Sequence, residues 1–211
     1  LPKNNILKEF NFKKSDFILL TISRLIKRKG HFIVIESLKS LLKKYSNIKY
    51  IIAGTGNKLY EEKLRNHVQS LKLDNSVFFL GYVNDKIINK VYNLCHLFVM
   101  TSLPTDSDGN SEGFGITFLE ANACAKPVIG TDVGGISDAI MDGKNGFLIE
   151  PNSPSKLEEA IIKIMDNKKL YKRLSSNSLN IISISRTYCL KTSSPCQTRA
   201  VGGRPAASIA S

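Results

Sequence analysis

Short apolar runs alternate along this chain with longer stretches in which apolar residues recur every three or four positions. The runs are rich in β-branched and aromatic residues, and most end beside Gly, Ser or Thr, which is typical of buried strands. The longer stretches are typical of amphipathic helices. The pattern predicts six strands, at 17–23, 48–53, 77–80, 97–101, 128–130 and 147–149. It predicts helices after Gly30, over 58–71, 85–94, 115–125 and 136–141, and from Pro154 onward.

Alternating strands and helices favour a parallel sheet, because each helix carries the chain back to the edge at which the next strand starts. We therefore predict an α/β fold, a doubly wound, Rossmann-like parallel sheet of about six strands. Ser153 is the expected N-cap of a helix that has Pro154 in its first turn. The helix after Gly30 is expected to bury Phe32, Ile35, Leu38, Leu41 and Leu42.

The segment 112–120, with the sequence EGFGITFLE, is a candidate binding site. Gly113 and Gly115 allow backbone to approach a ligand closely, and Gly115 precedes an apolar helical stretch. Unpaired amides at a helix start, together with the positive end of the helix dipole, favour a phosphate there. Glu112 and Glu120 can accept hydrogen bonds from sugar hydroxyls. The alternative interpretation is two solvated glutamates on a surface helix.

Two cations follow the first predicted strand. Arg24 lies at the end of that strand, and Lys29 comes just before the next helix, so both side chains can reach one anion at the carboxyl edge of the sheet. A guanidinium fork and an ammonium group together suit a diphosphate. A lone Arg or Lys in such a loop is usually only solvated, and it is the shared position that favours a site.

The net charge of +12 over 211 residues is unevenly distributed. Residues 1–49 carry 12 Lys or Arg against 3 Asp or Glu, whereas residues 50–182 carry 14 against 15. The basic first segment fits an anionic ligand, an acidic membrane surface or nucleic acid, or else a set of solvated lysines. We expect no nucleic-acid partner, because aromatic residues are not interleaved with the basic ones and no binding module is evident.

Membrane spans and disulfides are not expected. No stretch approaches 18 uninterrupted apolar residues, and the chain starts without an initiator Met, so we expect it to begin partway through a longer protein. The cysteines show neither paired nor zinc-ligand spacing, which favours a reducing compartment. We expect a cytoplasmic protein, with a peripheral contact at the inner face of a membrane left open. The four cysteines are Cys95, Cys124, Cys189 and Cys196.

Six segments, in family order, resemble the carboxyl-terminal half of a retaining glycosyltransferase with two Rossmann-like domains (GT-B), of the family 4 type known as glycosyl transferases group 1. The resemblance extends from about residue 15 to about residue 180. The fold it implies is one half of the two-domain GT-B architecture, the half that binds the donor. The segments are SRLIKRKG (23–30), IIAGTG (51–56), FLGYV (79–83), EGFGITFLEA (112–121), KPVIGTDVGGI (126–136) and DGKNGFLI (142–149).

The resemblance implies roles for individual residues. Arg24 and Lys29 would hold the donor diphosphate and stabilise charge as the glycosidic bond breaks. Glu112 would hold the transferred sugar and completes the implied catalytic set, whereas Glu120 would bind ribose hydroxyls. The implied backbone contacts are Gly81, Tyr82 and Val83 to the base, and Phe114, Gly115, Ile116 and Thr117 to the sugar and the distal phosphate.

The resemblance also implies a front-face reaction, in which the leaving phosphate helps to deprotonate the acceptor and no carboxylate nucleophile is needed. No cofactor and no metal are expected, because protein cations take the place of the metal, and Asp106 and Asp108 are interpreted as loop residues. The donor is a UDP-, GDP- or ADP-sugar. The acceptor is a sugar or a lipid-linked glycan, held by an N-terminal domain.

Some positions depart from the family pattern. Ala125 stands where the family usually has Gly before Lys-Pro, and Ser137-Asp138 replaces a common Pro-Glu. The loop 104–111 resembles those of members that act on lipid or polyprenyl-linked acceptors. The last segment, 183–211, has lost apolar periodicity, acidic residues and family likeness, and is predicted to be a disordered or non-native tail.

We predict three parts: a linker from a missing N-terminal domain at 1–15, a nucleotide-sugar-binding domain at 16–182, and the tail. The predicted function is transfer of a sugar, with retention, from a nucleoside diphosphate to a glycan or lipid-linked acceptor. Alternatives are another enzyme on the same fold, such as a sugar-nucleotide epimerase or phosphorylase, and a non-catalytic anion- or nucleotide-binding module. Without an N-terminal domain, these 211 residues are expected to bind donor but to transfer sugar negligibly.

Overall fold

The computed structural model of the chain describes residues 12–104, 113 and 115–191, with side chains described as far as residue 180. Within these residues a single six-stranded sheet has the order β3-β2-β1-β4-β5-β6, and every pairing in it is parallel. The order reverses between β1 and β4, which makes that position the topological switch point of a doubly wound sheet. The strands are β1 (Phe17–Ile22), β2 (Ile48–Ala53), β3 (Val77–Gly81), β4 (Leu97–Met100), β5 (Val128–Thr131) and β6 (Gly146–Ile149).

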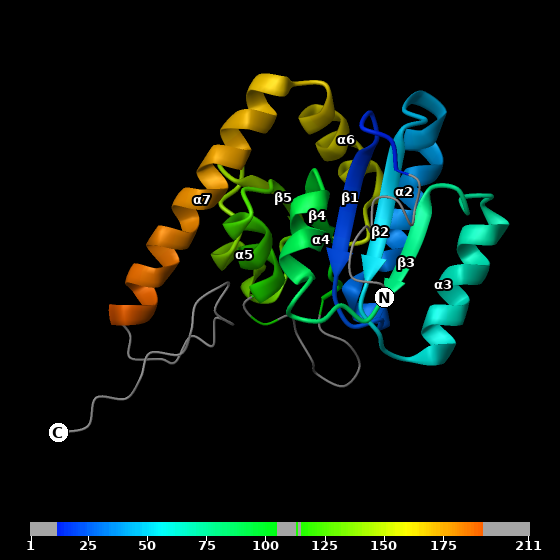
Figure 1. The fold of residues 1–211 in the computed structure, drawn as a ribbon, viewed down its shortest axis with the longest axis horizontal. Coiled ribbons are helices and arrows are strands. Elements are labelled where there is room, and N and C mark those ends of the chain that lie inside the picture. Colours follow the sequence, from blue (N-terminus) through cyan, green and yellow to red (C-terminus); the bar gives the residue numbers. More distant parts are fainter. Residues whose placement is uncertain (1–11, 105–112, 114, 192–211) are drawn as a thin grey trace.

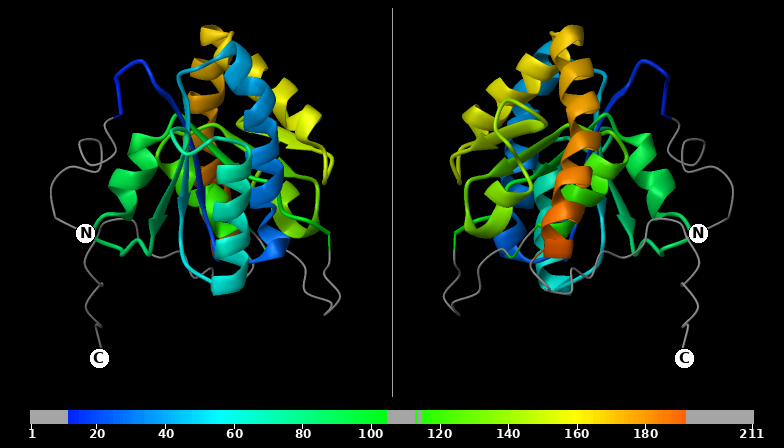
Figure 2. Two further views of the ribbon diagram at one scale, coloured as in Figure 1. Left: turned by 90° about the vertical axis from the view of Figure 1, so that its right-hand side faces the viewer. Right: turned by 90° about the vertical axis from the view of Figure 1, so that its left-hand side faces the viewer.

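Helices cover both faces of the sheet. The helices α2 (His31–Lys44), α3 (Lys58–Ser70) and α6 (Pro154–Met165) pack on one face. The helices α4 (Ile88–Leu94) and α5 (Ile116–Ala123) pack on the other, together with the 3-10 turn η2 (Gly134–Asp138). Figures 1 and 2 show α2 beside α3, with α4 across the sheet from them. This is the predicted α/β architecture.

The strands are buried on both faces, which explains why they appear in the sequence as continuous apolar runs. In β1, Leu19 faces the α2 layer, whereas Ile18 and Leu20 face the α4 and α5 layer. In α2, Ile35, Leu38 and Leu41 are buried as predicted. Val34 is buried too, whereas Phe32 and Leu42 are only partly buried against the same cluster.

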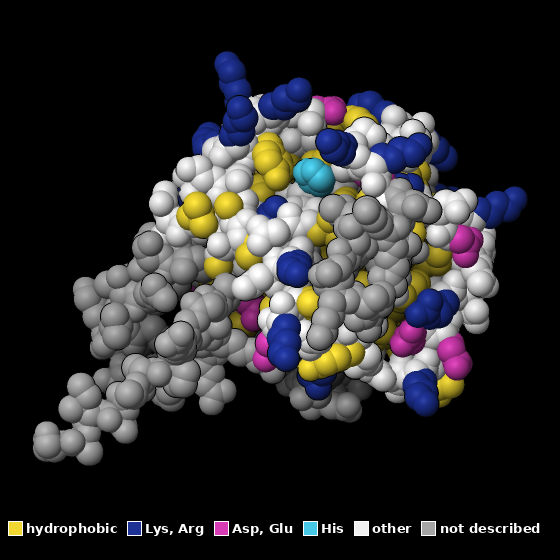
Figure 3. Space-filling model, viewed as in Figure 1, with side chains coloured by type: hydrophobic (Ala, Val, Ile, Leu, Met, Phe, Trp, Pro, Cys, Tyr) yellow, Lys and Arg dark blue, Asp and Glu magenta, His cyan; other side chains and the backbone are white. Residues whose placement is uncertain are grey.

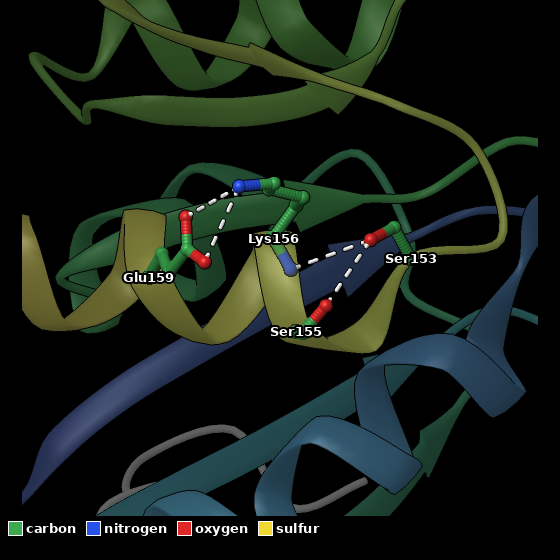
Figure 4. Close-up of polar contacts among 4 residues, drawn as sticks. All are labelled: Ser153, Ser155, Lys156 and Glu159. Carbon is green, nitrogen blue, oxygen red and sulfur yellow. Dashed lines mark hydrogen bonds and ion pairs between the residues drawn. The ribbon is translucent and has the colours of Figure 1, made fainter.

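The predicted cap of α6 is confirmed. Ser153 Oγ accepts a hydrogen bond from the Lys156 amide over 3.4 Å (Figure 4), and Pro154 is the first helical residue. The Lys156 ammonium also lies 3.0 Å from the Glu159 carboxylate on the exposed side of the helix. The turn therefore satisfies one of the amides that a helix start leaves without an intrahelical partner.

The bounds of three predicted helices were wrong. The helix expected over 85–94 is α4, which starts only at Ile88. The short helix expected over 136–141 is the 3-10 turn η2, which starts earlier and contains Gly135 in a non-helical conformation (φ −88°, ψ 17°). The helix expected over 115–125 is α5, and it stops at Ala123 because Ala125 adopts the left-handed conformation, with φ +55°. Ala125 is the position at which the family usually carries Gly, the residue that adopts this conformation without strain.

A further helix, α7 (Lys168–Lys191), was not predicted. Leu170, Leu174 and Ser178 recur on it at helical spacing and are buried, and the helix contacts α5 and α6. Its backbone continues through residue 191, which differs from the little order expected after residue 183. A helix satisfies its hydrogen bonds internally, so it can extend past its last packed turn. Residues 192–211 lie outside the described part, and the division of the chain into three parts stays a prediction.

Candidate functional site at the carboxyl edge of the sheet

The start of α2 is anchored at the switch point between β1 and β4. The hydroxyl of Thr101, just after β4, donates to the Gly30 carbonyl over 2.8 Å, and the Leu103 amide donates to the Arg28 carbonyl over 2.7 Å. Gly30 has φ +70°, and a Cβ placed on it would lie 1.8 Å from the Thr101 carbonyl oxygen. These contacts fix the 3-10 turn η1 (Lys27–Lys29), and with it Lys29, at the edge where such sheets bind ligands.

Three hydrogen-bonded side chains, Ser23, His31 and Tyr60, support the loop that carries Arg24. The Ser23 hydroxyl donates to the Arg24 carbonyl over 3.2 Å and lies 3.0 Å from His31 Nε2. His31 Nδ1 lies 3.4 Å from the Tyr60 hydroxyl on α3. One tautomer satisfies all three contacts, with Nε2–H donating to Ser23 and Nδ1 accepting from Tyr60. The loop is thereby tied to α2 and α3, while the Arg24 side chain itself stays exposed.

His31 is neutral at physiological pH. Its ring is fully buried, and this burial, reinforced by the nearby Lys29 ammonium, lowers its pKa to about 4. Burial also raises the pKa of the Tyr60 hydroxyl, which keeps its proton for donation. These hydrogen bonds among Ser23, His31 and Tyr60 could not be predicted from the sequence, because the three residues meet only when β1, α2 and α3 pack together.

The end of β3 presents the backbone expected to meet the base. Gly81 has φ +68°, and a Cβ on it would meet no atom of the described residues within 4 Å. Its carbonyl accepts from the Gly54 amide over 2.7 Å, which holds the ends of β2 and β3 together. The Tyr82 side chain is 70% exposed, whereas Val83 is buried in the core. Val83 thus anchors the loop, and Tyr82 is free to cover a ligand.

The start of α5 lies at the same edge. Gly115 precedes the helix with φ +64°, and a Cβ on it would lie 2.8 Å from the ring of Phe118. The first residues of the helix, Ile116 and Thr117, are exposed and half-buried respectively. Amides at such a helix start have no intrahelical acceptor, so they can bind a phosphate or a hydroxyl. Glu112 and Phe114 lie outside the described residues, and their roles stay predictions.

Glu120 has a partner that the sequence analysis did not find. It lies in the second turn of α5, half-buried, and its Oε2 accepts a hydrogen bond from the Tyr92 hydroxyl of α4 over 2.6 Å. Tyr92 is 1% exposed. Burial, and then the adjacent Glu120 charge, raises the pKa of Tyr92 well above its ordinary value, so the phenol remains a donor. Tyr92 sits in a helical apolar stretch, and its sequence context gives no sign of this role.

The residues that the structure describes hold no group of three or more His, Cys, Asp or Glu side chains that could bind a metal ion. Cys95 and Cys124 are free thiols, the first buried and the second half-buried. Among the described helices, none combines the length and apolar character that crossing a membrane requires.

Comparison with known proteins agrees with this fold. Residues 2–180 match the family model described as Glycosyl transferases group 1. An uncharacterized glycosyltransferase of Methanocaldococcus jannaschii is 32% identical over 175 residues, which cover 82% of this chain and 46% of the relative. The chain spans less than half the length of the first curated relatives that it matches.

Two solved structures superpose on this chain. The crystal structure of Anabaena HepE in complex with UDP-glucose superposes with a TM-score of 0.75 at 26% identity, covering 90% of this chain and 51% of that one. The C-terminal domain of a glycosyl transferase group 1 family protein (LpcC) from Francisella tularensis superposes with a TM-score of 0.72 at 25% identity, covering 88% and 94%. With a family model matching most of its length and a Rossmann-like sheet carrying the expected loops at one edge, the chain belongs to the glycosyl transferases group 1 family.

Proposed function

We propose that this chain is the donor-binding domain of a retaining, family 4 type GT-B glycosyltransferase. It binds a nucleoside-diphosphate sugar, whose sugar is transferred to a glycan or lipid-linked acceptor held by an N-terminal domain. The observation that carries the proposal is that three features lie at one edge of the sheet. They are the cationic segment 23–29, called here the β1–η1 loop, the open backbone at Gly81, and the start of α5 with Glu120. HepE, which shares this fold, was solved in complex with UDP-glucose.

The charges at this edge suit the proposed reaction. When the bond between the sugar and the phosphate breaks, negative charge grows on the leaving diphosphate. The backbone that carries Arg24 and Lys29, and the amides at the start of α5, are held in place before the reaction, so these groups stabilise that charge with little reorganisation. We propose that these groups make a metal unnecessary and that the leaving phosphate accepts the proton of the acceptor.

Titration with UDP, GDP and ADP, each with and without an attached sugar, tests the proposal by calorimetry. We expect one base to be preferred and its affinity to depend only weakly on ionic strength, because the ligand is held in a formed site. Equal binding of all three nucleotides that weakens steeply with salt would indicate a diffuse basic face instead. An assay of the full-length enzyme with free phosphate or water in place of an acceptor separates the epimerase and phosphorylase alternatives.

The two glutamates are expected to differ in role. Glu120→Gln should weaken binding of the bare nucleotide and of the nucleotide sugar by the same amount, about 1 to 3 kcal/mol. The reason is that both ligands contain the ribose that Glu120 is proposed to contact. Glu112→Gln should chiefly weaken the sugar-bearing donor. The measurement is the ratio of the two dissociation constants in each variant. Equal loss of bare-nucleotide affinity in both variants would contradict the division of roles.

A second proposal is a peripheral contact with anionic membrane lipid through the opposite, amino edge of the sheet. Figure 3 shows several Lys and Arg side chains along the upper rim, near which the strands of Figure 1 begin. Exposed lysines lie just before β1 and at the end of α2, namely Lys13, Lys14, Lys43 and Lys44. Such charges attract anionic headgroups within about a Debye length. Co-sedimentation with phosphatidylserine vesicles but not with phosphatidylcholine vesicles would support the contact, and equal sedimentation with both would refute it.

A further inference from the structure

The Tyr92 hydroxyl and the Glu120 carboxylate join α4 to α5 at the site edge. The 2.6 Å contact pairs a neutral donor with an ionisable acceptor, the kind of hydrogen bond that is shorter and stronger than one between two neutral groups. Side chains on a helix tilt toward its N-terminus, so Glu120 leans toward the start of α5, where the phosphate and sugar contacts are expected. From the observed pairing we infer that Tyr92 is a positioning residue for Glu120. This inference rests on the function proposed above.

Tyr92 is well suited to hold another side chain still. Its ring lies in the core layer between the sheet and the two helices, 5.9 Å from the ring of Phe98, which itself packs edge-on against Phe118 at 5.3 Å. A ring enclosed in this way has little freedom to change rotamer. The hydroxyl therefore presents its proton at a fixed point, where the Glu120 carboxylate accepts it.

The hydrogen bond to Tyr92 determines which carboxylate oxygen of Glu120 is available to a ligand. Because Oε2 is occupied by Tyr92, Oε1 and one rotamer of the side chain are set before any ligand arrives. Ordering a free Glu side chain costs conformational entropy and opposes binding, and a side chain that is already ordered is spared that loss. Tyr92 thus acts on the ribose contact specifically, and it sets the preference of the site for a ribonucleotide over a deoxyribonucleotide.

The test compares nucleotides that differ only in the ribose. Dissociation constants are measured by calorimetry for the nucleoside diphosphate that binds most tightly among UDP, GDP and ADP, and for its 2′-deoxy and 2′,3′-dideoxy forms. Tyr92→Phe should raise the dissociation constant of the ribonucleotide about three- to tenfold and change that of the dideoxynucleotide by less than about twofold. The preference of the site for the ribonucleotide should therefore fall. A merely structural defect would weaken all three ligands by the same factor.

Tyr45 supplies a matched control. Its hydroxyl donates to the Asp166 carboxylate over 2.7 Å at the end of α2, so Tyr45→Phe removes the same kind of contact away from the site. Tyr45→Phe should leave all three dissociation constants unchanged. Thermal melting of each variant shows whether it is folded.

The double variant Tyr92→Phe/Glu120→Ala keeps the inference testable even if an unpaired Glu120 prevents folding of the single variant. Its preference for ribose should equal that of Glu120→Ala alone, because Ala removes the acceptor through which Tyr92 acts. A further drop in the double variant, an unchanged preference in Tyr92→Phe, or an equal loss for every nucleotide would overturn the inference while leaving the proposed function standing. A wild-type chain that binds none of the nucleotides would overturn the proposed function itself.

Discussion

Replacing Gly30 with Ala is expected to lower the free energy of unfolding by about 2 to 5 kcal/mol, with loss of nucleotide binding. The left-handed conformation at φ +70° contributes about 1 to 2 kcal/mol of this for a residue with a Cβ. Overlap adds about 1 to 3 kcal/mol, because the new methyl group would lie 1.8 Å from the Thr101 carbonyl, which is backbone and cannot rotate away. Urea denaturation measures the change.

Gly143 provides the control for this substitution. It has the same φ of +70°, but within the part of the chain that the structure describes a Cβ on it would meet nothing within 4 Å. Gly143→Ala should therefore show the backbone strain alone, about 1 to 2 kcal/mol. Equal losses in the two variants would mean that the close packing of η1 against the end of β4 contributes nothing, and that the anchor described for Lys29 is absent.

The strands were predictable because each is buried on both faces and appears in the sequence as an apolar run. The helix starts at Ser153 and Gly115 were predictable as well, since capping depends on residues next to one another in the chain. The turn η2 was not, because its place is decided by the conformation of Gly135 and by the burial of Ile136 beneath α5.

The site could be predicted in its loops but not in its supporting contacts. The motif positions that lie within the described residues do come to the carboxyl edge, because the strand order brings them there. The partners that hold them in place come from other elements: Tyr92 for Glu120, and Tyr60 for His31. Such pairs form only through packing of α4 on α5 or α2 on α3, and no spacing in the sequence signals them.

Helix α7 was not predicted for a different reason. Ser175 and Ser178 donate to the carbonyls of Ala125 and Lys126, so polar residues of α7 bind the turn that follows α5. Because this surface of the helix is polar, its apolar repeat is weak and was missed. The same contacts hold the backbone around Ala125, which keeps a left-handed conformation although it has a Cβ.

Loss of either cation in the β1–η1 loop is expected to weaken nucleoside-diphosphate binding by about 1.5 to 3 kcal/mol, or about ten- to 150-fold in affinity. The expectation applies to Arg24→Ala and Lys29→Ala separately. Each side chain is proposed to donate charge-assisted hydrogen bonds to the diphosphate, and its backbone is held at the switch point by contacts that the substitutions leave in place. Melting temperatures should accordingly change little, because Arg24 is exposed and Lys29 only half-buried.

Lys27 is the matched control, since it is an exposed cation in the same 3-10 turn. Lys27→Ala changes the net charge by the same amount but removes no proposed contact, so affinity should fall by less than about threefold, and that loss should disappear in high salt. Calorimetry at low and high ionic strength distinguishes the two behaviours. If Arg24→Ala and Lys29→Ala left the affinity unchanged, or matched Lys27→Ala at both salt concentrations, the diphosphate assignment would be wrong and the cations would serve only as a general positive surface.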